Sequence, residues 1–154
     1  MRITIGSDHA GFRYRGLFEK ALRDGGHDVT VRGATSEDEP YDYTEVSEAV
    51  ARDVAEGRAE QGIIVAGSGN GEAIVANKIH GVRAAVCNDL YTAEMARRHN
   101  DANVLCVGQR ACGDAVALKV LEIWLATPFD GGRHAARIAN IAALEDRLKK
   151  EYGA

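Results

Sequence analysis

The chain has 154 residues, of which 45% are hydrophobic and 27% charged, and it contains only two prolines. This length and composition predict a single compact domain over residues 1–154. The formal net charge is −4 and no lysine- or arginine-rich run occurs, which argues against a nucleic-acid partner. Because no apolar run has the length of a membrane span and no signal-peptide pattern opens the chain, we expect a cytoplasmic protein without a membrane partner.

Five short apolar runs have the character of β-strands, and segments with helical spacing separate them. The strand-like runs cover residues 2–6, 28–32, 61–66, 82–87 and 103–107. An alternation of strands and helices predicts an α/β fold, built on a five-stranded parallel sheet with right-handed crossovers.

The helical segments lie between and after these runs. Apolar residues at helical spacing predict helices over residues 14–22, 46–54, 72–79, 90–99, 115–125 and 133–151. The segment 115–125 is apolar on nearly every side, which is more than one face of a sheet can cover. We therefore interpret this segment as part of a subunit interface.

Polar residues and glycines gather in the loops that follow the strand-like runs. The loops are SDHAG (7–11), GSGNG (67–71), NDLY (88–91) and GQR (108–110). Ligands of open parallel sheets bind outside the carboxyl ends of the strands, so we expect the functional site among these loops.

The loop after the third strand-like run is rich in glycine. It consists of Gly67, Ser68, Gly69, Asn70 and Gly71, and Glu72 follows directly. The backbone N–H groups of such a loop, with the start of the next helix, form a concavity for a phosphate or an oxyanion. Glutamate in a first helical turn also occurs for helix-dipole reasons alone. A carboxylate beside oxyanion donors suits proton abstraction from carbon, however, so we consider Glu72 a candidate general base.

A dinucleotide site is an alternative for the same loop. It requires a third glycine where this chain has Glu72, although Asp89 lies at a suitable distance to contact a ribose hydroxyl. The charged residue at a close-packing position argues against this alternative, and so does the lack of room for a second substrate domain.

Two of the five histidines suit a site. His9 lies in the loop after the first strand-like run, and His99 lies just before the fifth. Either of them could cap an element or act in catalysis. His27 and His80 fit structural or exposed roles better.

Arg133, His134 and Arg137 lie in the first turns of the last helix, where the helix dipole disfavours cations. We therefore expect an anion beside them. A surface acid such as Asp130 is one possibility, and a phosphate bound by two guanidinium groups is the other, with Arg110 as a third candidate ligand.

The three cysteines, Cys87, Cys106 and Cys112, form no CxxC pair and no disulfide framework. We expect buried free thiols in a reducing compartment, and no metal site.

Five segments, in the same order and at the same spacing, resemble the B-type ribose-5-phosphate isomerases, a family that includes the galactose-6-phosphate isomerase subunits. These are GSDHAG (6–11), GSGNGEAIVANK (67–78), GVRAAVC (81–87), ARRHNDANVLCVGQR (96–110) and GGRHAARI (131–138). The resemblance covers essentially the whole chain. It implies a Rossmann-like three-layer fold with a C-terminal helix. It also implies a homodimer or dimer of dimers, whose active site lies between subunits and needs no metal or organic cofactor.

The resemblance further implies roles for single residues. His99 would assist ring opening, and Ser68, Gly69 and Gly71 would stabilise the enediolate oxygen. The phosphate would be held by Arg110, Arg133 and Arg137, some of them across the subunit interface. The residues implied for sugar binding are Asp8, His9, Tyr43, Gly67, Asn70 and Asn100.

Two positions depart from the family pattern. Many members carry a cysteine base where this chain has Ala66, whereas a second branch uses the glutamate that matches Glu72. Members also commonly have proline where this chain has Thr44, next to Tyr43, so the backbone could differ there.

We therefore predict an aldose–ketose isomerase that interconverts ribose 5-phosphate and ribulose 5-phosphate through a cis-enediolate, with Glu72 moving the proton. The first alternative is an isomerase of a six-carbon sugar phosphate, of the galactose 6-phosphate or allose 6-phosphate type. A non-enzymatic sugar-phosphate sensor and a dinucleotide-binding oxidoreductase are the others.

Overall fold

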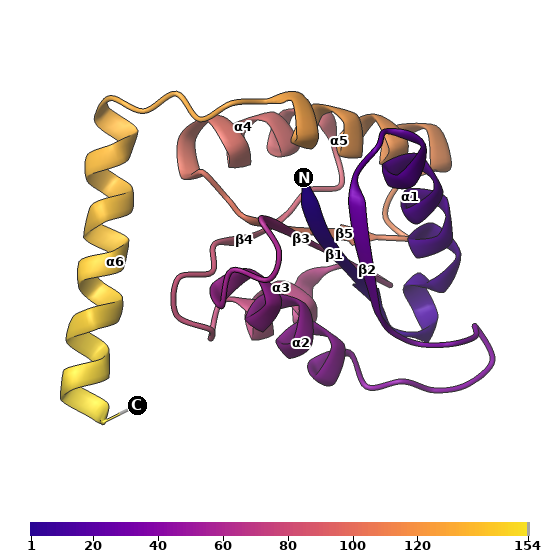
Figure 1. Ribbon diagram of the computed structural model, residues 1–154, viewed down its shortest axis with the longest axis horizontal. Coiled ribbons are helices and arrows are strands. Elements are labelled where there is room, and N and C mark those ends of the chain that lie inside the picture. Colours follow the sequence, from indigo (N-terminus) through magenta and orange to yellow (C-terminus); the bar gives the residue numbers. More distant parts are fainter. Residues whose placement is uncertain (154) are drawn as a thin grey trace.

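A five-stranded parallel sheet forms the centre of the molecule, in the order β2-β1-β3-β5-β4 (Figure 1). It belongs to a computed structural model that describes residues 1–153. The strands are β1 (Arg2–Ser7), β2 (Asp28–Gly33), β3 (Gln61–Ala66), β4 (Ala84–Val86) and β5 (Val104–Gly108). The predicted α/β fold with a five-stranded parallel sheet is confirmed. The predicted domain ends at residue 154, which lies outside the described residues.

Helices connect the strands and close the chain. A 3-10 turn, η1 (His9–Gly11), leads into the first of them. The helices are α1 (Phe12–Asp24), α2 (Tyr43–Ala55), α3 (Asn70–Ala76), α4 (Leu90–Asn100), α5 (Asp114–Ala126) and α6 (Arg133–Tyr152).

Most elements differ from their predicted bounds by a few residues, and two of these differences have a clear local cause. The helix predicted over 72–79 begins at Asn70, directly after Gly69, whose φ of 87° only glycine adopts readily. The strand predicted over 82–87 is limited to Ala84–Val86. At its start, the N–H of Arg83 donates to the side-chain oxygen of Asn103 instead of to a neighbouring strand.

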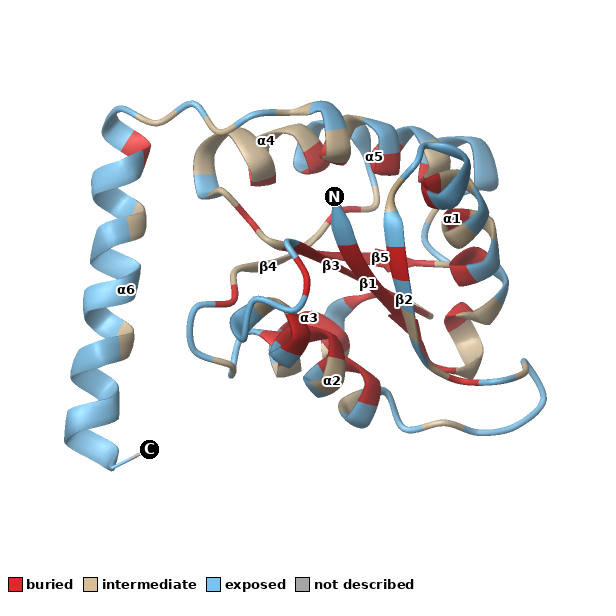
Figure 2. Cartoon of the chain, viewed as in Figure 1, coloured by how far each residue is buried: buried red, intermediate tan, exposed pale blue. Residues whose placement is uncertain are grey.

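Helices cover both faces of the sheet and give three layers (Figure 2). Apolar side chains of α1, α4 and α5 pack on one face, and those of α2 and α3 pack on the other. Trp124 of α5 is fully buried, and Leu118 and Ile123 pack against the same cluster. The apolar surplus of this helix is thus largely buried in its own chain and does not require a subunit interface, which stays a prediction.

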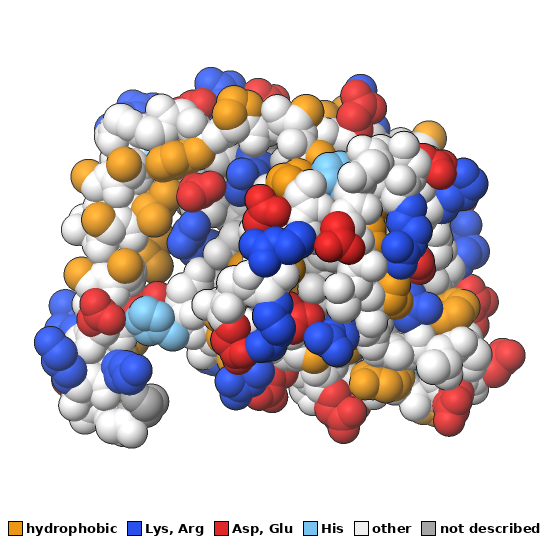
Figure 3. All heavy atoms as spheres, viewed as in Figure 1, with side chains coloured by type: hydrophobic (Ala, Val, Ile, Leu, Met, Phe, Trp, Pro, Cys, Tyr) orange, Lys and Arg blue, Asp and Glu red, His pale blue; other side chains and the backbone are white. Residues whose placement is uncertain are grey.

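The C-terminal helix α6 stands apart from the three layers (Figure 1). Of its 20 residues only His134 is buried, and Ile141, Leu144 and Leu148 are each about 40% exposed. Orange apolar side chains accordingly line this helix in Figure 3. Within residues 1–153, no helix combines the length and the apolar character that crossing a membrane requires.

The backbone of η1 lies unusually close to the backbone of β3. A Cβ atom added at Gly11 would lie 2.1 Å from the carbonyl oxygen of Val65. The N–H of Gly11 also donates to the carboxylate of Asp8 at 2.9 Å. Gly11 therefore allows the loop after β1 to lie directly against the end of β3.

We expect Gly11→Ala to lower the free energy of unfolding by about 1–3 kcal/mol, because a side chain there forces two backbone segments apart. Gly16→Ala is the matched control: Gly16 lies inside α1 with open space around it, and alanine should stabilise the helix by about 0.5–1 kcal/mol. Urea unfolding of both variants measures the difference. Equal effects would contradict the role given to Gly11.

Candidate active site

A cleft of about 570 Å³ opens at the carboxyl edge of the sheet, where β1, β3 and β5 end side by side. It is the crevice that parallel sheets typically use for ligands, because the chain crosses from one side of β1 to the other there. The cleft is lined by Asp8, His9, Ala10, Tyr43, Gly67, Ser68, Gly71, Glu72, Arg110 and Ala111. All but Ala10 and Ala111 are predicted site residues.

Glu72 and Asp8 are the two buried acids of this cleft, with 5% and 8% of their surfaces exposed. Burial raises the pKa of the Glu72 carboxyl above the ordinary value. A backbone N–H lowers that pKa, and the negative charge of Asp8 raises it. The neighbouring Ala66 is buried at the end of β3 and offers only a methyl group. Glu72 therefore has the environment of a general base whose pKa is shifted toward neutral pH.

Asp8 and His9 are held by hydrogen bonds to the backbone. The Asp8 carboxylate caps η1 by accepting from the N–H of Gly11. The Nδ1 atom of His9 accepts a hydrogen bond from the N–H of Tyr41 at 3.2 Å. This contact assigns the ring proton to Nε2, so that His9 can serve as a hydrogen-bond donor. Tyr41 was not predicted, because a backbone donor leaves no mark in the sequence.

The glycine loop has two kinds of residue. Gly67, Ser68 and Gly71 line the cleft, whereas Gly69 and Asn70 do not. Gly69 is buried, and its positive φ turns the chain from β3 into α3. The N–H of Asn70 donates to the hydroxyl oxygen of Ser68 at 3.3 Å. These two residues shape the loop in this chain, and their predicted contacts with substrate stay a prediction.

The loop at 88–91 supports the glycine loop from behind. The Asn88 side chain accepts from the N–H of Gly108 and donates to the carbonyl of Ser68. The Asp89 carboxylate accepts from the N–H and the hydroxyl of Thr92 and so caps α4. Because Asp89 has this role, the dinucleotide alternative loses its ribose ligand.

Tyr43 covers the loop from the start of α2. A Cβ atom added at Gly71 would lie 2.8 Å from the Tyr43 ring, so only glycine leaves room for it. The Asp42 carboxylate caps α2 by accepting from the N–H and the hydroxyl of Thr44. Proline at position 44 has no N–H to offer. Thr44, which replaces the proline common in the family, therefore allows this helix cap to form. Tyr43 still lines the cleft.

Arg110 reaches the cleft from the loop after β5. Backbone hydrogen bonds join this loop to the glycine loop, from Gln109 to Ala66 and from Arg110 to Gly67. The Gln109 side chain in turn accepts from the N–H of Tyr14 in α1. Gln109 was predicted only as part of a loop, because its anchoring partner is 95 residues away.

The remaining predicted residues lie elsewhere in the chain. His99 and Asn100 end α4, just before β5 begins, and so lie at the amino edge of the sheet. Arg133 and Arg137 lie at the start of α6. None of these four lines the cleft described above. His99 thus lies at the opposite edge of the sheet from His9, and the predicted roles of these four residues stay predictions.

These residues form a second cluster around His134. The rings of His99 and His134 stack with their centroids 4.2 Å apart, and Arg98 donates to both carboxylate oxygens of Asp130. Burial lowers the pKa of His134, and the nearby charges of His99 and Arg133 lower it further.

Three ligand atoms of His99, Asp130 and His134 lie within 4.8 Å of one another, a spacing that a metal ion could bridge. Parallel stacked rings point their lone pairs poorly at a common ion, however, and guanidinium groups surround the cluster. The surroundings favour an anion over a cation.

The candidate phosphate ligands differ from the other arginines in their pairing. Most arginines of residues 1–153 lie within 4.0 Å of a carboxylate. Asp130 pairs with Arg98 and not with the arginines of α6. Apart from Arg15, which donates to backbone carbonyls, the exceptions in this part of the chain are Arg110, Arg133 and Arg137.

Comparison with known proteins gives one consistent result. The family model described as Ribose/Galactose Isomerase matches residues 3–141. The chain is 39% identical to ribose-5-phosphate isomerase B of Escherichia coli, over 95% of this chain and 97% of that protein. It is 33% identical to D-erythrulose-4-phosphate isomerase of Pectobacterium atrosepticum, over 98% of this chain and 99% of that protein.

Solved structures agree with the sequence comparisons. Ribose-5-phosphate isomerase B of Clostridium thermocellum superposes with a TM-score of 0.93 at 40% identity, covering 96% of this chain and 99% of that chain. Ribose-5-phosphate isomerase B of Mycoplasma genitalium, with bound ribulose-5-phosphate, gives a TM-score of 0.90 at 34% identity, covering 94% and 96%. The resemblance seen in the sequence motifs is thereby confirmed, and the chain belongs to the ribose/galactose isomerase family.

Proposed function

We propose that this protein is an aldose–ketose isomerase that interconverts ribose 5-phosphate and ribulose 5-phosphate. The observation that carries the proposal is a buried Glu72 beside a glycine loop, in a cleft that also holds Arg110. Such a carboxylate can take a proton from one carbon and return it to the next. Family membership and the names of the relatives support this chemistry.

The reaction needs three groups besides the base. With the phosphate bound by arginines, Glu72 removes the C2 proton of the open-chain aldose, and the charge develops on the O1 oxygen of the enediolate. Backbone N–H groups of the glycine loop and the Ser68 hydroxyl stabilise that oxygen. The Nε2–H of His9 and the carboxylate of Asp8 bind sugar hydroxyls. The C2 hydroxyl proton passes to O1, and Glu72 then delivers its proton to C1, which leaves the carbonyl at C2 of the ketose. All of these steps use side chains and backbone of the protein alone.

We infer further that a complete site needs two copies of the chain. His99, Asn100, Arg133 and Arg137 lie away from the cleft of their own chain, and the two arginines have no carboxylate partner within residues 1–153. A second copy that brings these residues over the cleft would supply ring opening and phosphate binding. The exposed apolar side of α6, with Ile141, Leu144 and Leu148, supports such an association.

Ribose 5-phosphate is the substrate proposed, because relatives carrying that name match over nearly the full chain. The relatives named for D-erythrulose 4-phosphate favour a four-carbon sugar phosphate as an alternative substrate. A six-carbon sugar phosphate stays open as a second alternative. Turnover of four-, five- and six-carbon sugar phosphates, compared side by side, tests the choice. Location in the cytoplasm and the absence of a cofactor stay predictions.

We expect Glu72→Gln to lower kcat by about 10²- to 10⁴-fold with little change in substrate affinity, because the amide cannot accept the carbon-bound proton. Exchange of the C2 proton in D₂O, followed by NMR, reads the same step directly. Glu48→Gln, at an exposed position of α2, is the matched control and should exchange normally. A non-enzymatic sensor would show no exchange even in the wild type, and a fully active Glu72→Gln enzyme would remove the base assignment.

The raised pKa of Glu72 also predicts opposite effects on activity and stability. The acid limb of kcat/KM should lie above the ordinary glutamate pKa of about 4.3, because the base works only when ionised. A carboxyl group whose pKa is higher in the folded than in the unfolded chain stabilises the fold while it is protonated. This contribution is fully present below the pKa of the unfolded chain, and it is lost as the pH rises through the pKa of the folded chain. Glu72→Gln should therefore raise Tm relative to wild type at pH 8 and lose this advantage near pH 4. A Tm difference between Glu72→Gln and wild type that does not change with pH would contradict the raised pKa of Glu72.

The shared site can be tested by mixing variants. Glu72→Gln and His99→Gln should each lower activity, yet a purified heterodimer with one change on each chain keeps one intact site of two. We expect this heterodimer to recover about half of wild-type activity. With both changes on one chain and a wild-type partner, neither site is intact, so activity should stay low. If the heterodimer with both changes on one chain were the more active of the two, each chain would hold its own site.

A further inference from the structure

Asp101, at the end of α4, has an unusual backbone. Its φ of 42° makes it the one non-glycine residue with a positive φ in the described part of the chain. Helices commonly end on such a left-handed residue, but glycine usually occupies that place because a side chain there costs about 1 kcal/mol. The two residues before Asp101 are His99 and Asn100, which the proposed function assigns to the site.

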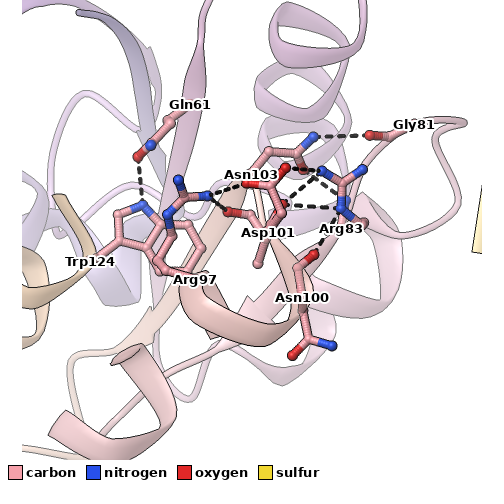
Figure 4. Close-up of polar contacts among 9 residues, drawn as sticks. Gln61, Gly81, Arg83, Arg97, Asn100, Asp101, Asn103 and Trp124 are labelled. Atoms are coloured by element: carbon pink, nitrogen blue, oxygen red, sulfur yellow. Dashed lines mark hydrogen bonds and ion pairs between the residues drawn. The ribbon is translucent and has the colours of Figure 1, made fainter. Parts of the chain in front are cut away.

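Two arginines hold Asp101 from opposite sides (Figure 4). The Arg83 guanidinium donates to the carbonyl of Asp101 at 2.7 Å and contacts its carboxylate at 3.3 Å. Arg97 contacts the other carboxylate oxygen at 3.2 Å and also donates to the carbonyl of Ala102. The side chains of Arg83 and Arg97 are 24% and 13% exposed and that of Asp101 is 40% exposed, so the two guanidinium groups are largely shielded while water still reaches the carboxylate. We call Arg83, Asp101 and Arg97 the α4 clamp.

Arg83 also holds the residue before Asp101. Its Nε atom donates to the carbonyl of Asn100 at 3.0 Å, while the side chain of Asn100 points away from the whole network (Figure 4). The clamp thus fixes the backbone of Asn100 and leaves its amide free to meet another group.

The clamp is tied to the core on two sides. The Arg97 guanidinium lies over the ring of Trp124, 5.5 Å from its centroid, and Trp124 donates to the side chain of Gln61 at 2.7 Å. On the other side, the Asn103 side chain accepts from the N–H of Arg83 and donates to the carbonyl of Gly81. The last turn of α4 is therefore fixed relative to the sheet.

We propose that Arg83 and Asp101 are positioning residues for catalysis, which hold Asn100 and the last turn of α4 in place for the cleft of a second copy. This inference rests on the shared site of the proposed function. A glycine alone would end the helix at lower cost, without any carboxylate for Arg83 and Arg97 to hold. A strained aspartate at position 101 makes sense if its carboxylate contacts fix the orientation of His99 and Asn100, the residues before it.

Arg83→Lys is the first test, because lysine keeps the charge and the aliphatic stem but cannot donate to two carbonyls from a planar fork. We expect kcat/KM to fall about tenfold, as for a small misplacement of a catalytic group. Asp101→Gly is the second variant: glycine keeps the left-handed turn and removes only the carboxylate contacts, so Tm should change little while kcat/KM falls. Arg52→Lys, in the exposed pair with Glu48, is the control and should change neither.

Heterodimers separate positioning from a general effect on stability. One heterodimer carries Glu72→Gln and Arg83→Lys on separate chains, and the other carries both on one chain beside a wild-type partner. The two have the same composition, so a merely structural role gives equal activity. If the clamp serves the partner's cleft, the separate arrangement keeps one intact site and should be about tenfold more active.

Each other result overturns the proposal in a recognisable way. Equal activity of the two heterodimers would show that the clamp is only structural and would leave the shared site untouched. Higher activity with both changes on one chain would show that each clamp serves its own chain, and would overturn the shared site as well. Asp101→Gly in place of Arg83→Lys repeats the comparison if the lysine variant folds poorly.

Discussion

The direction of a parallel sheet is the constraint on which the rest of this structure depends. Every crossover helix begins at the carboxyl edge of the sheet and returns the chain to the amino edge. Helix α4 has 11 residues and so spans about 16 Å, from its cap residue Asp89 at the carboxyl edge of the sheet to Asn100 at the amino edge. Residues at the two ends of such a helix cannot meet in one small site. The proposed reaction draws on residues at both sheet edges, which is why we propose a site shared between two copies.

Glu72 shows what the cleft requires from the fold. A carboxylate that is 5% exposed, with Asp8 as a negatively charged neighbour and without a cation bonded to it in residues 1–153, lowers the stability of the folded chain at neutral pH. Contacts elsewhere offset this cost. Asp53, which is also buried, receives hydrogen bonds from Arg32, Arg58 and Thr4, and these hold its pKa below the ordinary value although burial alone raises it. Two buried acids thus have pKa shifts in opposite directions, because Asp53 has cationic partners and Glu72 has none among the described residues.

Local patterns in the sequence were enough to predict the strands, the glycine loop and the place of Glu72 after it. These features depend on neighbouring residues: an apolar run, a glycine that permits a positive φ, and an acid in the first helical turn. Local patterns also placed His99 before the fifth strand and Arg133 at a helix start, but they do not tell which cleft such residues serve. Contacts between distant segments, such as the Tyr41 N–H on His9 or Arg83 on Asn100, depend on the folded backbone and leave no pattern in the sequence.

The unpaired arginines connect the two halves. In a chain with 23 acidic residues and a net charge of −4, a guanidinium near the surface readily finds a carboxylate, as Arg98 does with Asp130 beside the start of α6. Arg133 and Arg137 are only a few residues away and remain without one in the described chain, although the dipole of α6 adds positive potential there. Arg110, at the opposite edge of the sheet, likewise has no carboxylate partner in the described chain. A dianionic phosphate between two copies would compensate all three charges at once, so substrate binding and association of the chains would stabilise each other.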